Sequence, residues 1–384
     1  MKLIYLANIG IPSDWGHSVQ IMKMCEAFAE NGAEVKLVVA RGRNSNDNGN
    51  PFAFYNVKPI FKIVRVPSLN LFPGNPGAIW YWIRLFSFLI SARVYLLTQN
   101  YDVCYTRELY AGPFFKNVFM ERHLFPKVVT DFHKFVFNRV AGLVVLTSFL
   151  RSKLVDNGIG SRRILVAHDA VRLEDFDSEF STDFARSKLS IPNNIHVFGY
   201  VGTLKTMGME KGLTTAISAL LSLPQSYQLY VVGGENEDVE YYKKYAGDMH
   251  LAERVMFAGK VPHKDIPLHI GACDVLVAPF PENEHYSYYM SPLKIFEYMA
   301  SKRPMVVTDL PSLREVLIDA KTAMFAPTGD SKALAEKVRE LVENKTLARE
   351  LANSAYREVV EKYTWKKRAK DILEFIVQSK TESI

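Results

Sequence analysis

Short apolar runs rich in valine, isoleucine, leucine and aromatic residues alternate with segments of helical periodicity along this chain. Such an alternation is typical of parallel α/β units. In the first half the expected strands are Leu3–Ala7, Val35–Val39, Lys62–Val66, Val103–Thr106, Val118–Glu121, Leu143–Thr147 and Ile164–Ala167. In the second half they are Val197–Val201, Gln228–Val232, Arg254–Phe257, Val275–Ala278, Met305–Val307 and Ala323–Phe325. The pattern predicts an α/β protein of two facing Rossmann-like domains.

The helices expected between these strands set the domain limits. The clearest are Gln20–Glu30, Ser148–Asp156 with Ser148 as N-cap, Leu213–Leu221, Glu240–Tyr245, Pro292–Ser301, Ser331–Glu343, Leu347–Lys362 and Trp365–Val377. The charged segment 172–195 lacks a clear period and is interpreted as a linker. We expect an N-terminal domain over 1–171, a C-terminal domain over 196–362, and a final helix within 363–384 that packs back toward the first domain.

Composition agrees with this division. A chain of 384 residues with 48% hydrophobic and 23% charged residues suits two folded domains. The three cysteines lie far apart without metal-ligand spacing, and the opening apolar run is too short for a signal peptide. We therefore expect a cytoplasmic protein.

The net charge of +6 comes from the first half of the chain. Residues 1–190 hold 23 Lys and Arg against 16 Asp and Glu, and the remainder holds 24 against 25. Residues 51–100 contain basic residues but no acidic one, and include the apolar segment Ala78–Leu97. Arg84 and Arg93 inside that segment disfavour a transmembrane helix. Two interpretations stay open, an amphipathic helix on an anionic membrane surface and a buried helix of the first domain. The basic residues form no dense stripe, so nucleic acid is not an expected partner.

The segment that begins at Ser291 has the most informative pattern. Ser291 is a favoured helix N-cap and Pro292 a favoured first helical residue. The helix places Lys294 and Glu297 on one face. Lys294 lies in the first turn, where the helix dipole disfavours a cation unless an anion is bound there. Glu297 lies one turn further, and its carboxylate can accept hydrogen bonds from a ribose diol. A surface Lys–Glu pair explains the same spacing, and on spacing alone both interpretations stay open.

Around this helix the sequence resembles a known family. The run S-P-L-K-I-F-E-Y-M-A at 291–300, followed by S-K-R-P-M-V-V-T-D-L-P, is similar to the donor-binding signature of family-four retaining glycosyltransferases of the GT-B fold, in the subgroup with an S-P-L-K-x-x-E-Y-M-A motif. Y-V-G-T-L-K-T-M-G-M-E-K-G-L at 200–213, Y-V-V-G-G at 230–234, A-C-D-V-L-V-A-P-F at 272–280 and Y-T-W at 363–365 also match its pattern. The resemblance covers nearly the whole second half. It implies transfer of a sugar from a nucleotide-sugar donor with retention of configuration.

The resemblance also implies roles for particular residues. Glu297 would hold the donor ribose and Lys211 the diphosphate, and catalysis would depend on both. Lys294 and the amides that follow Ser291 would add to the phosphate cradle. The other implied donor-binding residues are Gly16, Gly202, Thr203, Lys205, Pro292 and Leu293. Because lysines and helix dipoles would neutralise the leaving group, we expect neither a metal nor another cofactor.

This chain departs from the family pattern at three positions. Many members carry a first glutamate eight residues before the second, where this chain has Tyr289. That glutamate contacts the transferred sugar, so the identity of the sugar stays open. Thr203 stands where an arginine is common, although Lys205 could replace its charge, and Lys302 stands in place of a glycine.

In the first half the resemblance is thinner. Gly10 and Gly16 lie in the loop after the first strand, which in the family closes over the donor phosphates and the acceptor; an ordinary turn is the alternative. V-F-M-E-R-H-L-F-P resembles the family's E-x-H segment, which implies that Glu121 and His123 contact the donor sugar and take part in catalysis. His133 is a rival to His123 for that role.

Two further charged motifs have structural interpretations. Arg107 is expected to pair with Asp102 rather than to bind an anionic acceptor. Asp175-Phe176-Asp177 mimics a D-x-D metal site, but it falls in the expected linker. We therefore expect no metal there.

The expected function is glycosyl transfer of the hexosyltransferase type. The acceptor would be a lipid-linked or cell-envelope glycan at the inner face of the cell membrane. One alternative, suggested by Tyr289, is a non-catalytic relative that binds a nucleotide sugar and regulates glycan assembly. Another is a nucleotide-sugar epimerase of similar build. Turnover on a panel of nucleotide sugars separates these possibilities.

Overall fold

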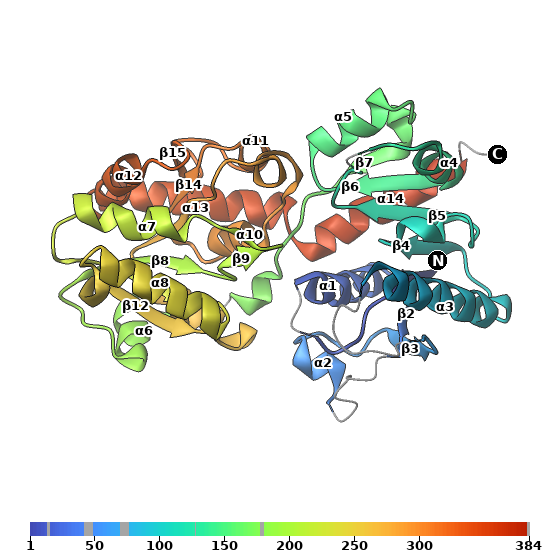
Figure 1. Ribbon diagram of the computed structural model, residues 1–384, viewed down its shortest axis with the longest axis horizontal. Coiled ribbons are helices and arrows are strands. Elements are labelled where there is room, and N and C mark those ends of the chain that lie inside the picture. Colours follow the sequence, from blue (N-terminus) through green and yellow to red (C-terminus); the bar gives the residue numbers. More distant parts are fainter. Residues whose placement is uncertain (14–15, 42–48, 70–76, 127, 177–179, 382–384) are drawn as a thin grey trace. The chain divides into compact units, whose positions relative to one another are not determined.

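The computed structural model consists of two α/β units (Figure 1). The first is formed by Met1–His168 together with Trp365–Ile384, and the second by Asp169–Thr364. The structure describes residues 1–13, 16–41, 49–69, 77–126, 128–176 and 180–381.

A seven-stranded parallel sheet forms the centre of the first unit, with the strand order β3-β2-β1-β4-β5-β6-β7. Its strands are β1 (Lys2–Ala7), β2 (Glu34–Ala40), β3 (Lys62–Val66), β4 (Val103–Thr106), β5 (Val118–Arg122), β6 (Gly142–Val145) and β7 (Ile164–Val166). The reversal of strand order between β1 and β4 is the point at which Rossmann-like sheets bind ligands.

The helices of the first unit come from both ends of the chain. They are α1 (Gly16–Glu30), α2 (Pro51–Phe54), α3 (Ala78–Leu97), α4 (Asp131–Arg139), α5 (Ser148–Asp156) and α14 (Trp365–Thr381), with a short 3-10 helix η1 (Leu109–Ala111). The last helix, α14, lies beside α1, where Asn31 donates to the Lys366 carbonyl at 3.0 Å. The expectation that the C-terminal helix packs with the first domain is therefore confirmed.

The second unit repeats the architecture with a six-stranded parallel sheet of order β12-β11-β8-β13-β14-β15. Its strands are β8 (His196–Val201), β11 (Tyr227–Val232), β12 (Val255–Gly259), β13 (Val275–Ala278), β14 (Met305–Thr308) and β15 (Met324–Ala326), with a separate ribbon of β9 (Lys205–Thr206) and β10 (Met209–Glu210). The order reverses between β8 and β13, as it does between β1 and β4.

Helices cover both faces of this second sheet. They are α6 (Thr182–Leu189), α7 (Leu213–Ala219), α8 (Asn236–Asp248), α9 (Ile266–Gly271), α10 (Leu293–Ala300), α11 (Pro311–Arg314), α12 (Ser331–Glu343) and α13 (Lys345–Lys362), with η3 (Leu173–Asp175) and the π-helix η7 (His285–Tyr289). Side chains alternate between two cores along each strand: Val197 and Val201 of β8 belong to one, Phe198 and Tyr200 to the other. The alternation follows from the two-residue period of a strand.

The structure differs from the sequence expectations at three places. The segment 172–195, interpreted as a linker, belongs to the second unit, and Arg186 of its helix α6 is buried in an ion pair with Asp274. The side chain that caps α5 is Thr147 rather than Ser148. Helix α10 begins after Pro292, and Ser291 does not cap it. The first and last differences each depend on a partner distant in sequence: Asp274 for Arg186 and the Asp169 amide for Ser291. Local periodicity cannot reveal such partners.

Candidate functional site

The loops that follow β8 and β13 meet at the carboxyl edge of the second sheet. A Cβ atom added to Gly212 would lie 1.6 Å from the Pro279 carbonyl oxygen, and Gly212 has a φ of +82°. No other residue type fits there without a shift of the backbone. The loop before α7 is thus held against the end of β13, and it carries Lys211 with it.

Lys294 extends along the loop after β8. A Cβ atom on Gly202 would lie 3.0 Å from its Cε atom and 3.3 Å from its Nζ atom. The Nζ atom lies 3.6 Å from the ring centroid of Tyr200, a cation–π contact. It is buried and has no hydrogen-bond partner among the described residues. A buried ammonium group without an acceptor is costly, so an anion at this position would stabilise it.

Lys211 lies near Lys294, and His285 lies near Lys211. Lys211 donates from Nζ to Thr203 Oγ1 at 2.6 Å. Burial lowers the pKa of Lys294 well below its usual value, and the nearby Lys211 lowers it further. Burial also lowers the pKa of Lys211, to about 8. The pKa of His285 is lowered by burial and then by Lys211, and its buried Nδ1 has no partner within the described part of the chain. An anion bound at this edge of the sheet would favour the charged forms of these three groups.

Glu297 lies one turn further along α10 and supplies the carboxylate. Its Oε1 lies 3.2 Å from Nε2 of His263, which is half-exposed. Tyr298 fixes the helix against the sheet: its hydroxyl accepts from the Val201 amide at 2.9 Å, at the end of β8. The helix face expected to carry Lys294 and Glu297 also carries Tyr298, and it is largely turned inward, with Lys294 and Tyr298 buried.

The start of α10 leaves backbone amides without intrahelical partners, as every helix start does. Pro292 is the cap residue, and no side chain bonds to the first turn. The Ser291 hydroxyl instead accepts a hydrogen bond from the Asp169 amide at 2.8 Å, within the second unit. Leu293 is the first helical residue and is partly exposed. The amides at this start remain available to a ligand because Ser291 is engaged elsewhere.

Lys205 is placed differently from the other lysines. Its Nζ pairs with Asp238 of α8 at 2.7 Å and lies over the Tyr241 ring. The charge that could replace the family's arginine is therefore already neutralised by a carboxylate. Thr203 contributes its hydroxyl to Lys211.

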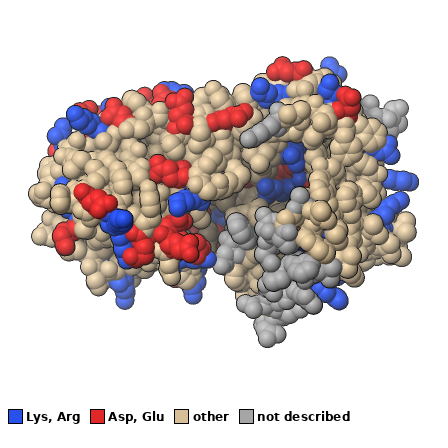
Figure 2. Space-filling model, in the orientation of Figure 1, with Lys and Arg blue, Asp and Glu red and all other residues tan. Residues whose placement is uncertain are grey.

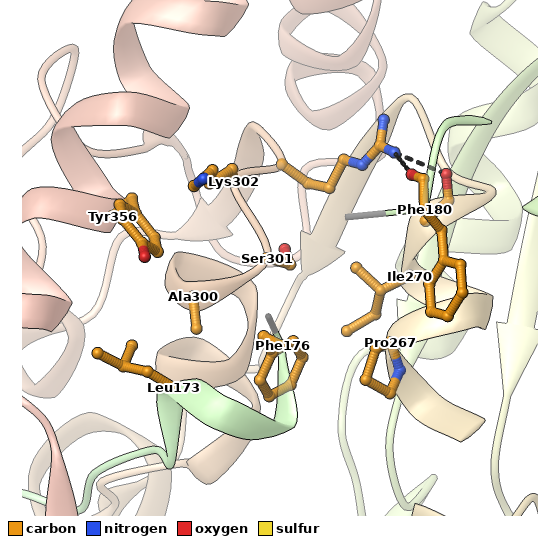
Figure 3. Close-up of a pocket in the computed structure, with 11 residues that line it drawn as sticks. Leu173, Phe176, Phe180, Pro267, Ile270, Ala300, Ser301, Lys302 and Tyr356 are labelled. Atoms are coloured by element: carbon orange, nitrogen blue, oxygen red, sulfur yellow. Dashed lines mark hydrogen bonds between the residues drawn. The ribbon is translucent and has the colours of Figure 1, made fainter. Parts of the chain in front are cut away.

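A hollow of about 240 Å³ lies at the opposite end of α10 (Figure 3). Figure 3 shows Phe176, Phe180, Pro267 and Ile270 on its walls, with Lys302 and Tyr356 at another side. Its lining includes none of the basic residues described above. Arg303 of this lining donates to the Gly271 carbonyl at 2.8 Å and is part of the internal structure.

In the first unit, Glu121 at the end of β5 is the centre of a buried polar cluster. Its carboxylate accepts from Gln20 at 2.6 Å and from Arg368 of α14 at 3.1 Å, and it also bonds the Tyr105 hydroxyl. Burial alone would raise the pKa of the Glu121 carboxyl, but Arg368 and then His123 hold it well below its usual range. The side chain of Glu121 has no exposed surface. In this arrangement the carboxylate is occupied by groups of the protein, and its expected contact with a sugar stays a prediction.

His123 lies between Glu121 and Arg107. Its Nδ1 is 2.9 Å from Nη2 of Arg107 and its Nε2 is 2.5 Å from Glu121. Arginine can only donate, so Nδ1 accepts and Nε2 carries the proton. Burial, followed by Arg107, lowers the pKa of His123 to about 4. The ring is therefore neutral near pH 7, and both of its nitrogens are bound within the protein.

The other expectations for the first unit have mixed outcomes. Arg107 bonds Gln20 and His123, so the expected pairing with Asp102 is wrong: Asp102 accepts from the Lys2 amide instead. His133 belongs to a capping box with Thr130 at the start of α4.

The glycines of the first loop and the D-x-D motif are also placed by the structure. Gly16 begins α1, and a Cβ atom on it or on Gly10 would meet no neighbour within 4 Å. Asp175 pairs with Arg172, and Asp177 lies outside the described residues. Across the ranges that the structure describes, no group of three or more His, Cys, Asp or Glu side chains could hold a metal ion.

Three of the residues that complete these clusters were missed by sequence reasoning. Arg368 stands among Trp365, Ala369 and Ile372 on the buried face of α14. A lone arginine on an apolar helix face was the available sign that it pairs with a buried acid. The sequence holds no comparable sign for His285 or Gln20, because neither is a polar residue within an otherwise apolar helix face.

Comparison with known proteins supports the resemblance seen in the sequence. Residues 195–344 match the protein family described as Glycosyl transferases group 1. The phosphatidyl-myo-inositol mannosyltransferase of Mycobacterium leprae is 31% identical over 167 residues, which are 43% of this chain and 42% of that protein. The match thus spans less than half of the relative's length. It supports the family for the second unit.

Solved structures extend the likeness to the whole chain. Sucrose-phosphate synthase from Thermosynechococcus elongatus is 17% identical with a TM-score of 0.80, covering 98% of both chains. HepE from Anabaena in complex with UDP and glucose is 15% identical with a TM-score of 0.72, covering 98% of this chain and 99% of that one. These comparisons confirm the fold class, two Rossmann-like domains of the GT-B type.

Proposed function

We propose that this protein is a glycosyltransferase that moves a sugar from a nucleotide-sugar donor to an acceptor. The observation that carries the proposal is the buried Lys294 Nζ atom, which has no hydrogen-bond partner among the described residues and lies close to Lys211 at the switch point of the second sheet. A diphosphate would satisfy both lysines and the amides at the start of α10. Glu297, one turn away, would accept hydrogen bonds from the donor ribose.

The remaining donor contacts follow from the same placement. Gly202 lets the backbone after β8 approach a phosphate closely, since it has no side chain and a φ of +129°. Thr203 would be freed as Lys211 turns toward the anion. Lys205 would contribute only if it left Asp238, and Gly16 of the first unit would approach the phosphates at the start of α1.

The proposed reaction is a displacement at the anomeric carbon with retention of configuration. The bond from this carbon to the diphosphate oxygen breaks, and a bond to the acceptor hydroxyl oxygen forms on the same face. The acceptor proton passes to the departing phosphate. Lys211 and Lys294 would stabilise the charge that develops there, in place of a metal ion. His123 would act near the sugar, positioned by the buried Glu121.

Nucleotide binding provides the first test. Titration with UDP, GDP and ADP should give binding to at least one, and Lys294→Met should weaken it by about tenfold to a hundredfold, since charge-assisted bonds contribute about 1.5–3 kcal/mol. Lys211→Met and Glu297→Gln should lower both affinity and turnover. Lys302→Met, at the other end of α10, is the control and should bind normally.

The stability of the Lys294 variant separates function from architecture. Because the ammonium group is buried without an acceptor, Lys294→Met should leave the melting temperature unchanged or raise it. The proposal would be overturned if Lys294→Met bound nucleotide as tightly as the wild type.

The acceptor is proposed to be a lipid-linked or cell-envelope glycan, handled at the cytoplasmic face of a membrane. Helix α3 supports this. Its buried face includes Leu85 and Phe88. A second row of apolar residues on the helix is 40–73% exposed: Ile79, Phe86, Ile90, Val94 and Leu97. In Figure 2 a broad part of the first unit's visible face carries no charged side chain. The structure contains no described helix that is long and apolar enough to span a bilayer.

Vesicle flotation tests the membrane contact. Vesicles rich in phosphatidylglycerol should retain the protein at low salt, because residues 51–100 are basic without an acidic residue. Ile90→Ser with Val94→Ser should reduce retention, whereas Val155→Ser, an exposed apolar position on α5, should not. Equal retention of all variants would contradict this contact.

A further inference from the structure

His263 bonds the carboxylate of Glu297 from a different loop of the second unit. It begins the short 3-10 helix η6 (His263–Asp265), which follows β12. Its Nε2 atom lies 3.2 Å from Glu297 Oε1, and because an ionised carboxylate can only accept, Nε2 carries the proton. The side chain of Glu297 is 18% exposed, against 46% for His263. The bond therefore reaches from the protein surface to a carboxylate that is mostly enclosed.

Backbone contacts fix the turn that carries His263. Pro262 precedes it with a φ of −58°, and the Pro262 carbonyl accepts from the Asp265 amide at 2.9 Å. At the start of the same loop, the Gly259 carbonyl accepts from the Gly233 amide at 2.7 Å, where β11 has ended. The imidazole is thus offered to Glu297 from a loop that is tied to the neighbouring strand.

The same chain of contacts continues to the proposed phosphate site. A Cβ atom on Gly233 would lie 2.4 Å from the Gly202 carbonyl oxygen, and a Cβ atom on Gly202 would lie 3.0 Å from Lys294 Cε. Lys294 and Glu297 are one turn apart on α10, and Glu297 leads back to His263. The loops after β8, β11 and β12 therefore form, with α10, a closed frame around one site. His263 completes the frame at its Glu297 end.

The bond to His263 fixes the direction of the Glu297 side chain. A half-exposed pair of this kind contributes little to folding stability. A free glutamate side chain, however, loses rotamer freedom when a ligand fixes it, and this loss weakens binding. A carboxylate that is already held loses less. It also offers about four lone-pair positions, of which the imidazole uses one.

We propose that His263 is a positioning residue for the nucleotide, which holds Glu297 with its remaining lone pairs toward the 2′- and 3′-hydroxyl groups of a ribose. The inference rests on the proposed function, in which Glu297 binds the donor ribose. It adds that the site selects a ribonucleotide over one that lacks these hydroxyl groups, and that this selection depends on a side chain from outside α10.

Paired ligands measure the selection. UDP, GDP and ADP are titrated by calorimetry beside their 2′,3′-dideoxy forms, and the ratio of the two affinities reports the hydroxyl contacts alone. For the nucleotide that binds, the wild-type ratio should be at least about tenfold, because the dideoxy form cannot bond the carboxylate. Glu297→Ala should bring the ratio close to one. His263→Phe should lower it about three- to tenfold, because Glu297 is then no longer held.

Two further variants separate the hydrogen bond from the shape of the turn. His263→Gln keeps an N–H donor of similar reach and should restore the ratio to within about twofold of the wild type. Lys264→Phe changes the next residue of the same turn, which is also exposed, and should leave the ratio unchanged. The affinity for pyrophosphate, which has no ribose, should stay within about twofold in His263→Phe, and the melting temperature checks that each variant is folded.

Three results would overturn the inference. One is a wild-type ratio in His263→Phe, which includes equal losses of both nucleotide forms, since the ring would then act on the base. The others are a ratio in His263→Gln as low as in His263→Phe, and an equal fall in Lys264→Phe.

The two proposals fail separately. If Glu297→Ala abolishes the selection and His263→Phe keeps it, only the role of His263 falls. If Lys294→Met binds nucleotides as tightly as the wild type, the transferase proposal falls, whatever the ratio in His263→Phe. A full ratio in Glu297→Ala would remove the ribose from Glu297, and with it both this inference and that part of the proposed function.

Discussion

Lys211 and Lys294 are both held in surroundings that oppose their charge. Neither has a carboxylate at hydrogen-bond distance among the described residues, and the pKa of each is lowered chiefly by burial. Such an arrangement weakens the free protein slightly and strengthens a complex with an anion. It is a typical way to prepare a site for a phosphate.

The affinity for a nucleoside diphosphate should therefore depend on pH. The pKa of Lys211 is about 8 in the free protein, and a bound diphosphate would raise it. At a pH between the pKa of the free protein and that of the complex, Lys211 therefore takes up a proton when the nucleotide binds. Affinity should fall as the pH rises through about 8, where Lys211 of the free protein loses its proton, by up to about tenfold per pH unit. Lys294, with its lowered pKa, acts in the same direction.

Calorimetry of nucleotide binding from pH 7 to 10 measures this dependence. Lys211→Arg keeps its charge over the whole range, so its profile should be flatter than that of the wild type. An affinity that rises with pH would contradict the assignment of Lys211 to the diphosphate.

At the scale of elements, the turn before α7 and the helix α10 converge because of tight backbone packing. Gly212 contacts the Pro279 carbonyl, and Gly233 would place a Cβ atom 2.4 Å from the Gly202 carbonyl oxygen. The ends of three strands are thus close enough to share one ligand.

Gly212→Ala should disrupt this turn. We expect a loss of several kcal/mol of stability, from overpacking and from a left-handed backbone together, with loss of nucleotide binding. Gly208→Ala is the control, because Gly208 also has a positive φ, of +77°, but a Cβ atom there meets no neighbour within 4 Å. Its cost should be about 1–2 kcal/mol. Chemical denaturation compares the two, and equal losses would show that the contact with Pro279 does not matter.

Helix α14 stabilises the first unit through one buried ion pair. Arg368→Met should cost about 3–5 kcal/mol, because Glu121 would then be buried with its charge uncompensated. Adding Glu121→Gln should recover part of this loss. Lys370→Met, exposed on the same helix, should change the unfolding free energy by less than about 0.5 kcal/mol. An Arg368→Met variant as stable as the wild type would show that the pair contributes little.

At the scale of the whole molecule, the chain is divided unevenly between its two units. The second unit is one continuous segment with its own sheet and two hydrophobic cores, whereas the first needs both ends of the chain. All the proposed donor-binding residues except Gly16 lie in the second unit.

A fragment of residues 169–364 should therefore fold by itself and bind the nucleotide. Residues 1–168 without α14 should be much less stable, since Glu121 would lack Arg368. Circular dichroism and thermal unfolding test the fragments, and nucleotide titration tests the site. A fragment 169–364 that folds without binding any nucleotide would place an essential contact in the first unit.

The sequence by itself determined the strands, most helices and which helix is proposed to bind an anion. Strands such as Val103–Thr106 and Val275–Ala278 agree with the structure residue for residue, because apolar periodicity and cap residues are local properties of the chain. The positions of Lys294 and Glu297 on α10 followed from the helical period for the same reason.

Only the tertiary structure decided which groups meet. Ser291 is engaged by an amide 122 residues away, and Glu121 is neutralised by an arginine 247 residues away. Burial then shifted the pKa values of Lys211, Lys294 and His123. Partners and desolvation depend on segments brought together by packing, and no local pattern encodes them.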